Sequence, residues 1–316
     1  MKVMLTGASG FIGSKLLEQL PADKTLSLGR DKPEGQPSEQ FFELEIDSHT
    51  DYSVALSGVD IVVHLAARVH VMNDSVSDPL EAYREVNTYG TANLARQAAK
   101  VGVKRFIFVS SIKVNGESTM ADRPFTSADE HMPEDDYGQS KAEAEYQLFA
   151  IGKETGMEIV VIRPMLVYGP GVKANFASLM NLVSKGFPLP FACIKDNRRS
   201  LVSVTNLVDL IVTCIDHPKA SNQTFLVSDG HDVSTSEMVR QMALSLGKSQ
   251  WQLPVPKWSY KLAGKLLDKQ DMVDRLLGSL QVDITHTKET LGWQPSQTLE
   301  EGFKETAQAF LLSQKS

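Results

Sequence analysis

The stretch KVMLTGASGFIG, residues 2–13, decides the fold of this chain. Its first half, Lys2–Thr6, has the composition of a buried strand, and a helical pattern with an apolar face follows from Phe11 to Leu20. Glycines at this spacing permit a tight turn, close approach of a pyrophosphate and packing of the helix against the strand. The start of the helix adds free N–H groups for the phosphates. The stretch predicts a dinucleotide site cradled by Gly7, Ser9, Gly10, Phe11, Ile12 and Gly13.

Further β-rich runs alternate with helix-length segments through the first half of the chain. We expect strands at 25–28, 40–44, 60–65, 104–109 and 158–162, and helices at about 79–100 and 137–155. The last four of these strands are apolar nearly throughout, as in a parallel sheet covered on both faces. The alternation therefore predicts an α/β fold with a doubly wound parallel sheet.

The pattern changes after Pro170. Prolines then separate shorter helices and one or two strands, including 224–227. We expect a dinucleotide-binding domain over 1–170 and a smaller, mainly substrate-binding α/β lobe over 171–316. The boundary is approximate, and some chain is allowed to cross back.

Composition limits the classes of function. The 316 residues are 42% hydrophobic and carry a formal net charge of −7, which argues against a general nucleic-acid binder. Two cysteines, Cys193 and Cys214, are too few for a disulfide framework and favour a reducing compartment. No run approaches the ~18 apolar residues of a membrane helix, and the His and Cys residues lack metal-ligand spacing. We expect a cytoplasmic protein that binds no membrane, nucleic acid or metal.

The end of the second strand bears on the choice of cofactor. An NAD site usually has an acidic side chain there for the ribose hydroxyls. This chain has Gly29 and then Arg30, whose guanidinium suits a 2′-phosphate. The sequence thus favours NADP(H). NAD(H) stays open because Asp31 follows directly.

A serine, a tyrosine and a lysine form the candidate catalytic group. Ser110 and Ser111 follow the strand at 104–109, at the edge where doubly wound folds bind ligands. Tyr137 and Lys141 are four residues apart on the next predicted helix and so share one face. The ammonium of Lys141 and an oxidised nicotinamide would favour the phenolate of Tyr137, and Ser111 would hydrogen-bond the same substrate oxygen.

With these motifs the chain resembles the extended short-chain dehydrogenase/reductase family, within its nucleotide-sugar epimerase/dehydratase group. The resemblance covers nearly the whole length. It is carried by the glycine turn, Glu45-Ile46-Asp47, His64-Leu65-Ala66-Ala67, Asn87, Ser110-Ser111, Tyr137 with Lys141, Arg163-Pro164 through Tyr168-Gly169-Pro170, Arg199-Ser200-Leu201-Val202, Asn206-Leu207-Val208-Asp209 and Leu291-Gly292-Trp293-Gln294-Pro295.

The resemblance implies a Rossmann sheet, a UDP-sugar substrate, a homodimer and further site residues. Cofactor contacts would be Ile46, Asp47, Leu65, Ala66, Ala67, Asn87, Tyr137, Lys141, Pro164 and Val167. On the substrate side it implies Ser111, Asn175, Phe191 on a uracil ring and Arg199 on the diphosphate. His70, Lys113 and His131 either border the pocket or have surface and structural roles.

Departures from the family pattern narrow the reaction. Ser111 is followed by Ile112 and Lys113, whereas the 4,6-dehydratases have an Asp-Glu pair there, so elimination is disfavoured. Arg30, and Leu277–Leu280 in place of a second diphosphate arginine, favour an NADPH-dependent 4-keto-sugar reductase. The stretch Ser110–Gly116 resembles bacterial surface-polysaccharide enzymes that reduce UDP-4-keto-6-deoxy-N-acetylhexosamines. The alternative is a UDP-glucose or UDP-N-acetylglucosamine 4-epimerase with tightly bound NAD, and Arg275 could supply its second arginine. A non-catalytic NADP(H)-sensing protein and a dehydrogenase for an apolar alcohol are the remaining alternatives.

Overall fold

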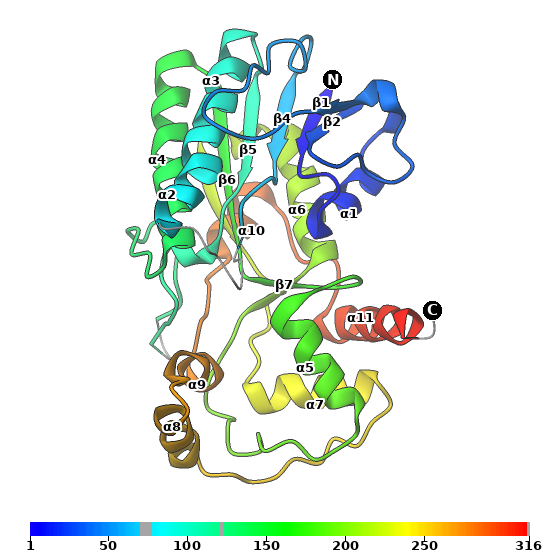
Figure 1. The fold of residues 1–316 in the computed structure, drawn as a ribbon, viewed down its shortest axis with the longest axis vertical. Coiled ribbons are helices and arrows are strands. Elements are labelled where there is room, and N and C mark those ends of the chain that lie inside the picture. Colours follow the sequence, from blue (N-terminus) through cyan, green and yellow to red (C-terminus); the bar gives the residue numbers. More distant parts are fainter. Residues whose placement is uncertain (70–77, 121–122, 315–316) are drawn as a thin grey trace.

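A seven-stranded parallel sheet forms the centre of the molecule (Figure 1). The computed structural model describes residues 1–69, 78–120 and 123–314. The strands lie in the order β3-β2-β1-β4-β5-β6-β9, and each pair is parallel. Their bounds are β1 Val3–Thr6, β2 Thr25–Gly29, β3 Phe41–Glu43, β4 Ile61–His64, β5 Arg105–Val109, β6 Glu158–Pro164 and β9 Gln223–Val227. The doubly wound sheet expected from the sequence is confirmed.

Helices cover both faces of this sheet. On one face α1 (Phe11–Gln19) packs with α6 (Val204–Asp216), and Leu16 lies in their shared core. The other face carries α2 (Pro79–Arg84), α3 (Thr91–Lys100) and α4 (Asp136–Thr155). Short 3₁₀ turns lie at Ala22–Lys24, Ser38–Gln40, Ile112–Val114 and Pro218–Ala220. The apolar central strands β1, β4, β5 and β6 are therefore buried beneath helices, as their composition requires.

The helix expected over 79–100 is interrupted by a wider turn. Between α2 and α3, residues Glu85–Gly90 form a π-helical segment that contains Asn87. A Cβ on Gly90 would stand 2.9 Å from the backbone of Ile46 and Asp47, so this segment presses against the loop after β3. Helical patterns do not reveal such an insertion, and π-helical turns often occur at functional sites.

The smaller lobe has its own core below the sheet (Figure 1). It contains the two-stranded parallel sheet of β7 (Leu166–Tyr168) and β8 (Leu201–Ser203), with α5 (Ala174–Ser184), α7 (Thr235–Ser245) and α11 (Leu299–Ser313) around it. The helices α8 (Lys257–Leu266) and α9 (Gln270–Leu277) lie at its edge. β9, α6 and α10 (Thr285–Leu291) come after residue 170 but belong to the sheet layer.

Two motifs quoted for the resemblance meet at the junction of these layers. The indole Nε1 of Trp293 donates to Oδ2 of Asp209 at 2.7 Å. Asp229 accepts from the Tyr168 hydroxyl at 2.7 Å and from Asn206 Nδ2 at 2.6 Å. These buried bonds hold the second half of the chain on the sheet.

Candidate active site

The glycine turn has no room for side chains. Gly7 has φ +71°, and a Cβ there would stand 2.8 Å from the amide nitrogen of Ala66. A Cβ on Gly13 would stand 2.1 Å from the carbonyl oxygen of Gly7. Helix α1 starts after Gly10 without a side-chain cap, so its first N–H groups remain available to phosphates. The turn therefore fits a dinucleotide pyrophosphate.

A buried histidine fixes the strand ends beside this turn. His64 shares hydrogen bonds with Thr6 Oγ1 at 2.7 Å and with Thr91 Oγ1 at 2.9 Å. Complete burial lowers the pKa of His64 to about 3, so the ring is neutral. Thr6 Oγ1 also accepts from the amide of Ala66 at 3.1 Å. His64 thus positions the segment Leu65–Ala67, which the resemblance assigns to the cofactor.

Asn87 connects two parts of the site through its side-chain amide. Its Oδ1 accepts from the amide of Arg68 at 2.8 Å, and its Nδ2 donates to the carbonyl of Arg68 and to Ser140 Oγ, both at 3.0 Å. The π-helical turn places Asn87 between the segment after β4 and helix α4. These hydrogen bonds of Asn87 are all to protein groups, so its role is to position the segment after β4 relative to α4.

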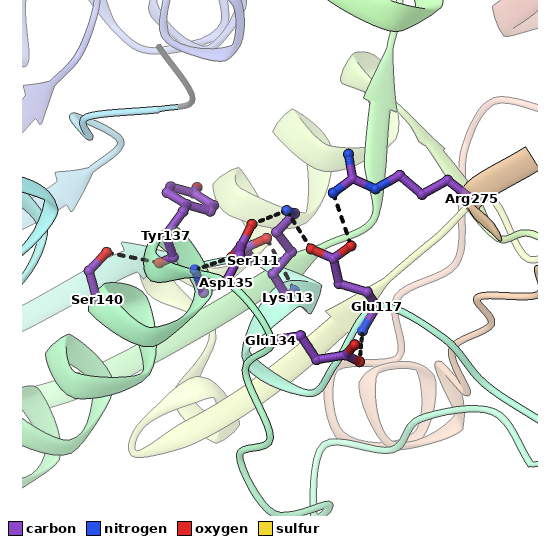
Figure 2. Close-up of polar contacts among 9 residues, drawn as sticks. Ser111, Lys113, Glu117, Glu134, Asp135, Tyr137, Ser140 and Arg275 are labelled. Carbon is purple, nitrogen blue, oxygen red and sulfur yellow. Dashed lines mark hydrogen bonds and ion pairs between the residues drawn. The ribbon is translucent and has the colours of Figure 1, made fainter. Parts of the chain in front are cut away.

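Ser111, Tyr137 and Lys141 come together at the carboxyl edge of the sheet. The side chain of Asp135 caps α4 by accepting from the amide of Gly138 at 2.7 Å, and the helix then presents Tyr137 in its first turn and Lys141 in its second. Lys141 Nζ donates to the carbonyl of Val109 at 3.0 Å, directly below Ser110 and Ser111. Figure 2 shows Tyr137 and Ser111 near the start of this helix.

Burial moves the pKa values of the tyrosine and the lysine in opposite directions. It lowers the pKa of Lys141 to about 7, and it raises the pKa of Tyr137, with a further contribution from the carboxylate of Asp135. The protein alone thus holds the phenol protonated. A phenolate would need additional positive charge nearby, which an oxidised nicotinamide would provide.

Charged residues connect the serine loop to the smaller lobe (Figure 2). Lys113 pairs with Asp135 and, at 2.8 Å, with Glu117, whose other oxygen accepts from Arg275 of α9 at 3.2 Å. Burial disfavours the ammonium of Lys113, but the two carboxylates outweigh burial and raise its pKa. Lys113 therefore stands as a cation two residues after Ser111, where a dehydratase has its glutamate.

Arg199 lies on the smaller-lobe side of this chain of charges. Its Nη1 donates to the carbonyl of Arg275 at 2.7 Å and more distantly to that of Gly278. Burial and the charge of Arg275 lower the pKa of Arg199. The guanidinium of Arg199 thus lies against the main chain of Arg275, and the positive charges of both side chains act on this part of the site.

A buried ion pair below the serines was missed by the sequence analysis. Glu145 accepts from Ser110 Oγ at 2.5 Å and from Arg163 Nη2 at 2.6 Å. Arg163 also donates to Asn115 at 3.0 Å, and its Nη2 lies 2.6 Å from Nε2 of His131. His131 therefore belongs to a structural network. The Arg163-Pro164 motif could have indicated this ion pair, because an arginine inside an apolar strand needs a buried partner.

The other predicted residues lie in several parts of the fold. The carboxylate of Asp47 accepts from the amides of His49 at 2.8 Å and Thr50 at 2.7 Å, so it holds its own turn. Arg30 is exposed at the end of β2, and Phe191 packs against the small-lobe core. Ile46 is buried, Pro164 ends β6 and Val167 lies in β7. His70 and the side chain of Asn175 lie outside the described residues.

Comparisons with known proteins define the class. Residues 3–228 match the model of the NAD dependent epimerase/dehydratase family, so the chain belongs to this family. It is an enzyme of the nucleotide-sugar epimerase type within the extended short-chain dehydrogenases/reductases, and the resemblance stated from the sequence is confirmed.

Individual relatives and one solved structure show which kinds of epimerase the chain is similar to. The chain is 62% identical to a UDP-glucose 4-epimerase of Vibrio cholerae over 98% of this chain and 95% of that protein. It is 28% identical to an N-acetyl-alpha-D-glucosaminyl-diphospho-ditrans,octacis-undecaprenol 4-epimerase of Escherichia coli O157:H7, over 97% and 94%. The fold matches UDP-glucuronic acid 4-epimerase from Bacillus cereus in complex with NAD, with a TM-score of 0.79, 20% identity and 99% of both chains covered.

Proposed function

We propose that this enzyme interconverts UDP-hexoses at C4, with UDP-glucose as a substrate and NAD as a retained cofactor. The observation that carries the proposal is the 62% identity, over 98% of the chain, to a UDP-glucose 4-epimerase. The 4-keto-sugar reductase favoured by the sequence analysis is supported less well than the epimerase that it named as the alternative. NADP(H) is likewise replaced by NAD(H), because the family that matches is NAD-dependent.

The residues of the site fit the chemistry of an epimerase. An oxidised nicotinamide dinucleotide held at the cradle of Gly7, Gly10 and Gly13 would supply reversible hydride transfer at C4 of the sugar. Tyr137 accepts the proton of the C4 hydroxyl in the first direction and returns it in the second. The ammonium of Lys141 stabilises the phenolate, and Ser111 holds the C4 oxygen by a hydrogen bond. The carbonyl of Val109 keeps Lys141 at this edge.

The residues after Ser111 do not supply the acid and the base that elimination of water from the sugar requires. Lys113 stands where a dehydratase has glutamate, and its pairing with Asp135 and Glu117 keeps it protonated. An ammonium in that state does not abstract a proton from carbon. The charge of Lys113 therefore supports reversible oxidation at C4 without loss of water.

The diphosphate of the nucleotide would meet Arg199 and Arg275. The Arg199 guanidinium lies against the main-chain carbonyl of Arg275, and the Arg275 side chain pairs with Glu117. An arriving diphosphate would replace Glu117 as the partner of Arg275. Dimerisation and a role in surface-polysaccharide synthesis stay predictions of the sequence.

Two measurements on the purified protein test this proposal. The first is the identity and stoichiometry of the nucleotide released on denaturation, for which we expect NAD(H) near one per chain. The second is conversion of UDP-glucose to UDP-galactose without added cofactor, with Tyr137→Phe as the inactive control. Release of NADP(H), or reduction of UDP-4-keto sugars by NADPH without epimerisation, would contradict the proposal and favour the 4-keto-sugar reductase instead.

A further inference from the structure

Helices α8 and α9 form a hairpin that packs little on the rest of the protein. The one buried residue of α8 is Gly264, and α9 has none. A Cβ on Gly264 would stand 2.7 Å from Val273 Cγ2, so the two helices meet each other at this point. Figure 1 shows the hairpin at the edge of the smaller lobe, away from the large sheet. Most of the surface of α8 thus faces solvent.

An apolar stripe runs along the exposed side of α8. Trp258, Leu262 and Leu266 are spaced by four residues and are 68%, 52% and 76% exposed. Residues four apart lie on one face of a helix. Leu267 and Met272, 68% and 63% exposed, add apolar surface at the hairpin turn and on α9. Scattered single apolar residues are ordinary on a protein surface, but a continuous stripe marks an interaction site.

A row of lysines lies beside this stripe. Lys257, Lys261 and Lys265 each precede one residue of the stripe, so the two rows run side by side along the helix. Lys269 follows with the same spacing. The hairpin, residues 257–277, contains four lysines and one arginine against three aspartates, a formal charge of +2, within a chain whose net charge is −7. The positive charge of the hairpin is concentrated on α8, which carries three lysines and no acidic residue.

We propose that the hairpin binds the surface of an anionic lipid bilayer. Trp258, Leu262 and Leu266 would enter the boundary between headgroups and acyl chains, and Lys261 and Lys265 would contact lipid phosphates together with Lys257, which would exchange its exposed partner Asp196 for a phosphate. Tryptophan combines an apolar ring with a polar N–H and is favoured at that depth. Lysine can bury its methylenes while its ammonium stays among the headgroups. The order of these residues on α8 matches such a layered environment.

This contact is peripheral and does not involve a spanning segment. Among the residues that the structure describes, no helix has the length and apolar composition needed to cross a bilayer. The expectation from the sequence that the protein binds no membrane rested on spanning segments. A short basic amphipathic helix binds by a different route, which depends on lipid charge and is reversible.

The hairpin is also connected to the candidate active site. Arg275 of α9 contacts Glu117, and its carbonyl accepts from Arg199. A bilayer that holds the hairpin would hold these arginines at its surface as well. The bilayer contact itself stands independently of the proposed epimerase activity.

Sedimentation with vesicles tests the contact on the full chain with its retained nucleotide. We expect binding to vesicles of equal parts phosphatidylglycerol and phosphatidylcholine, loss of binding in high salt, and little binding to phosphatidylcholine alone. Substituting Lys257, Lys261 and Lys265 by Gln should weaken binding about a hundredfold, given the contribution of each lysine near an anionic surface. A matched triple substitution of the exposed Lys100, Lys153 and Lys304 by Gln should leave it unchanged.

The apolar stripe needs a separate variant. Leu262→Ser with Leu266→Ser should lower vesicle affinity at least tenfold, and in a Trp251→Phe background the tryptophan emission should shift to the blue with anionic vesicles only where both leucines are present, because Trp293 is buried. Nucleotide content and circular dichroism report whether each variant is folded. Equal binding by the two lysine variants would overturn the proposal. The proposal would also be overturned if the protein did not bind vesicles and instead formed an oligomer that depends on Leu262 and Leu266.

Discussion

The buried pair Glu145–Arg163 gives the sharpest test of how the site is supported. Glu145→Gln keeps the size of the side chain but removes the charge that faces Arg163. Helix α4 supplies its own control two residues earlier, because Glu143 pairs with Arg84 at 2.6 Å, the same distance as in the buried pair. The two glutamates differ mainly in burial. Side chains in the Glu145 pair are 1–3% exposed, whereas those in the Glu143 pair are 27–30% exposed.

The expected cost follows from that difference. Removing one partner of a buried ion pair leaves the other charge uncompensated and costs about 3–5 kcal/mol. Breaking an exposed pair costs about 0–1 kcal/mol, because water and salt replace the lost partner. Glu145→Gln should therefore lower the free energy of unfolding by several kcal/mol more than Glu143→Gln. Arg163→Met in the Glu145→Gln background should restore part of the loss, since the unpaired charge is then gone.

Urea unfolding of the three variants and the parent protein measures these differences. The pH dependence gives a second check. Hydrogen bonds from His131, Arg163 and Ser110 outweigh burial and lower the pKa of Glu145 below its ordinary value of 4.5. Its stabilisation is therefore present above that value and is lost as the pH falls through the lowered pKa. Equal losses for Glu145→Gln and Glu143→Gln at neutral pH would refute the reasoning.

Four further predictions concern the candidate site. Tyr137→Phe should lower kcat at least a hundredfold and leave the nucleotide content unchanged, as measured on the same preparation. Gly13→Ala should abolish nucleotide retention because its Cβ would meet the Gly7 carbonyl at 2.1 Å, whereas Gly29→Ala, with open space around it, should not. In nucleotide-stripped protein, urea midpoints should rise from pH 7 toward pH 10 in the parent but not in Lys141→Met, because burial lowers the pKa of Lys141 to about 7. Arg30→Ala should leave the NAD content unchanged, and a loss of bound NADP(H) would contradict this.

The sheet could be predicted because its strands carry strong local signals. Val62, Ile107 and Val160 belong to runs that are apolar nearly throughout, and all three are buried. The positions of β9 and α6 in the sheet layer depend on contacts between distant segments, such as Trp293 with Asp209. No local pattern encodes those contacts. The π-helical turn at Glu85–Gly90 was missed for the same reason, because Gly90 is fitted to a loop about forty residues earlier.

The candidate site was predictable where residue type and spacing imply chemistry. Tyr137 and Lys141 needed only the period of a helix, and the structure places them in successive turns of α4. The partners that set their surroundings could not be found in this way. The carbonyl of Val109 under Lys141 comes from the packing of α4 on β5, which only the three-dimensional structure supplies, and the carboxylate of Asp135 acts on Tyr137 because it caps the same helix.

The cofactor preference shows how a local rule can mislead. The sequence analysis used the side chain that follows β2, and Arg30 does stand there. A bound 2′-phosphate, however, needs several donors that converge on its oxygens, because a single exposed guanidinium gains little from an anion in water. Arg30 is exposed, and it is followed by the acidic Asp31, which suits ribose hydroxyls. The cradle of Gly7 and Gly13 fits the pyrophosphate of either dinucleotide, so the cradle itself does not distinguish NAD from NADP. The choice between NAD and NADP therefore depends on the relative positions of Arg30 and Asp31 at the ribose. The family match to NAD-dependent enzymes favours Asp31 as the residue that contacts the ribose hydroxyls.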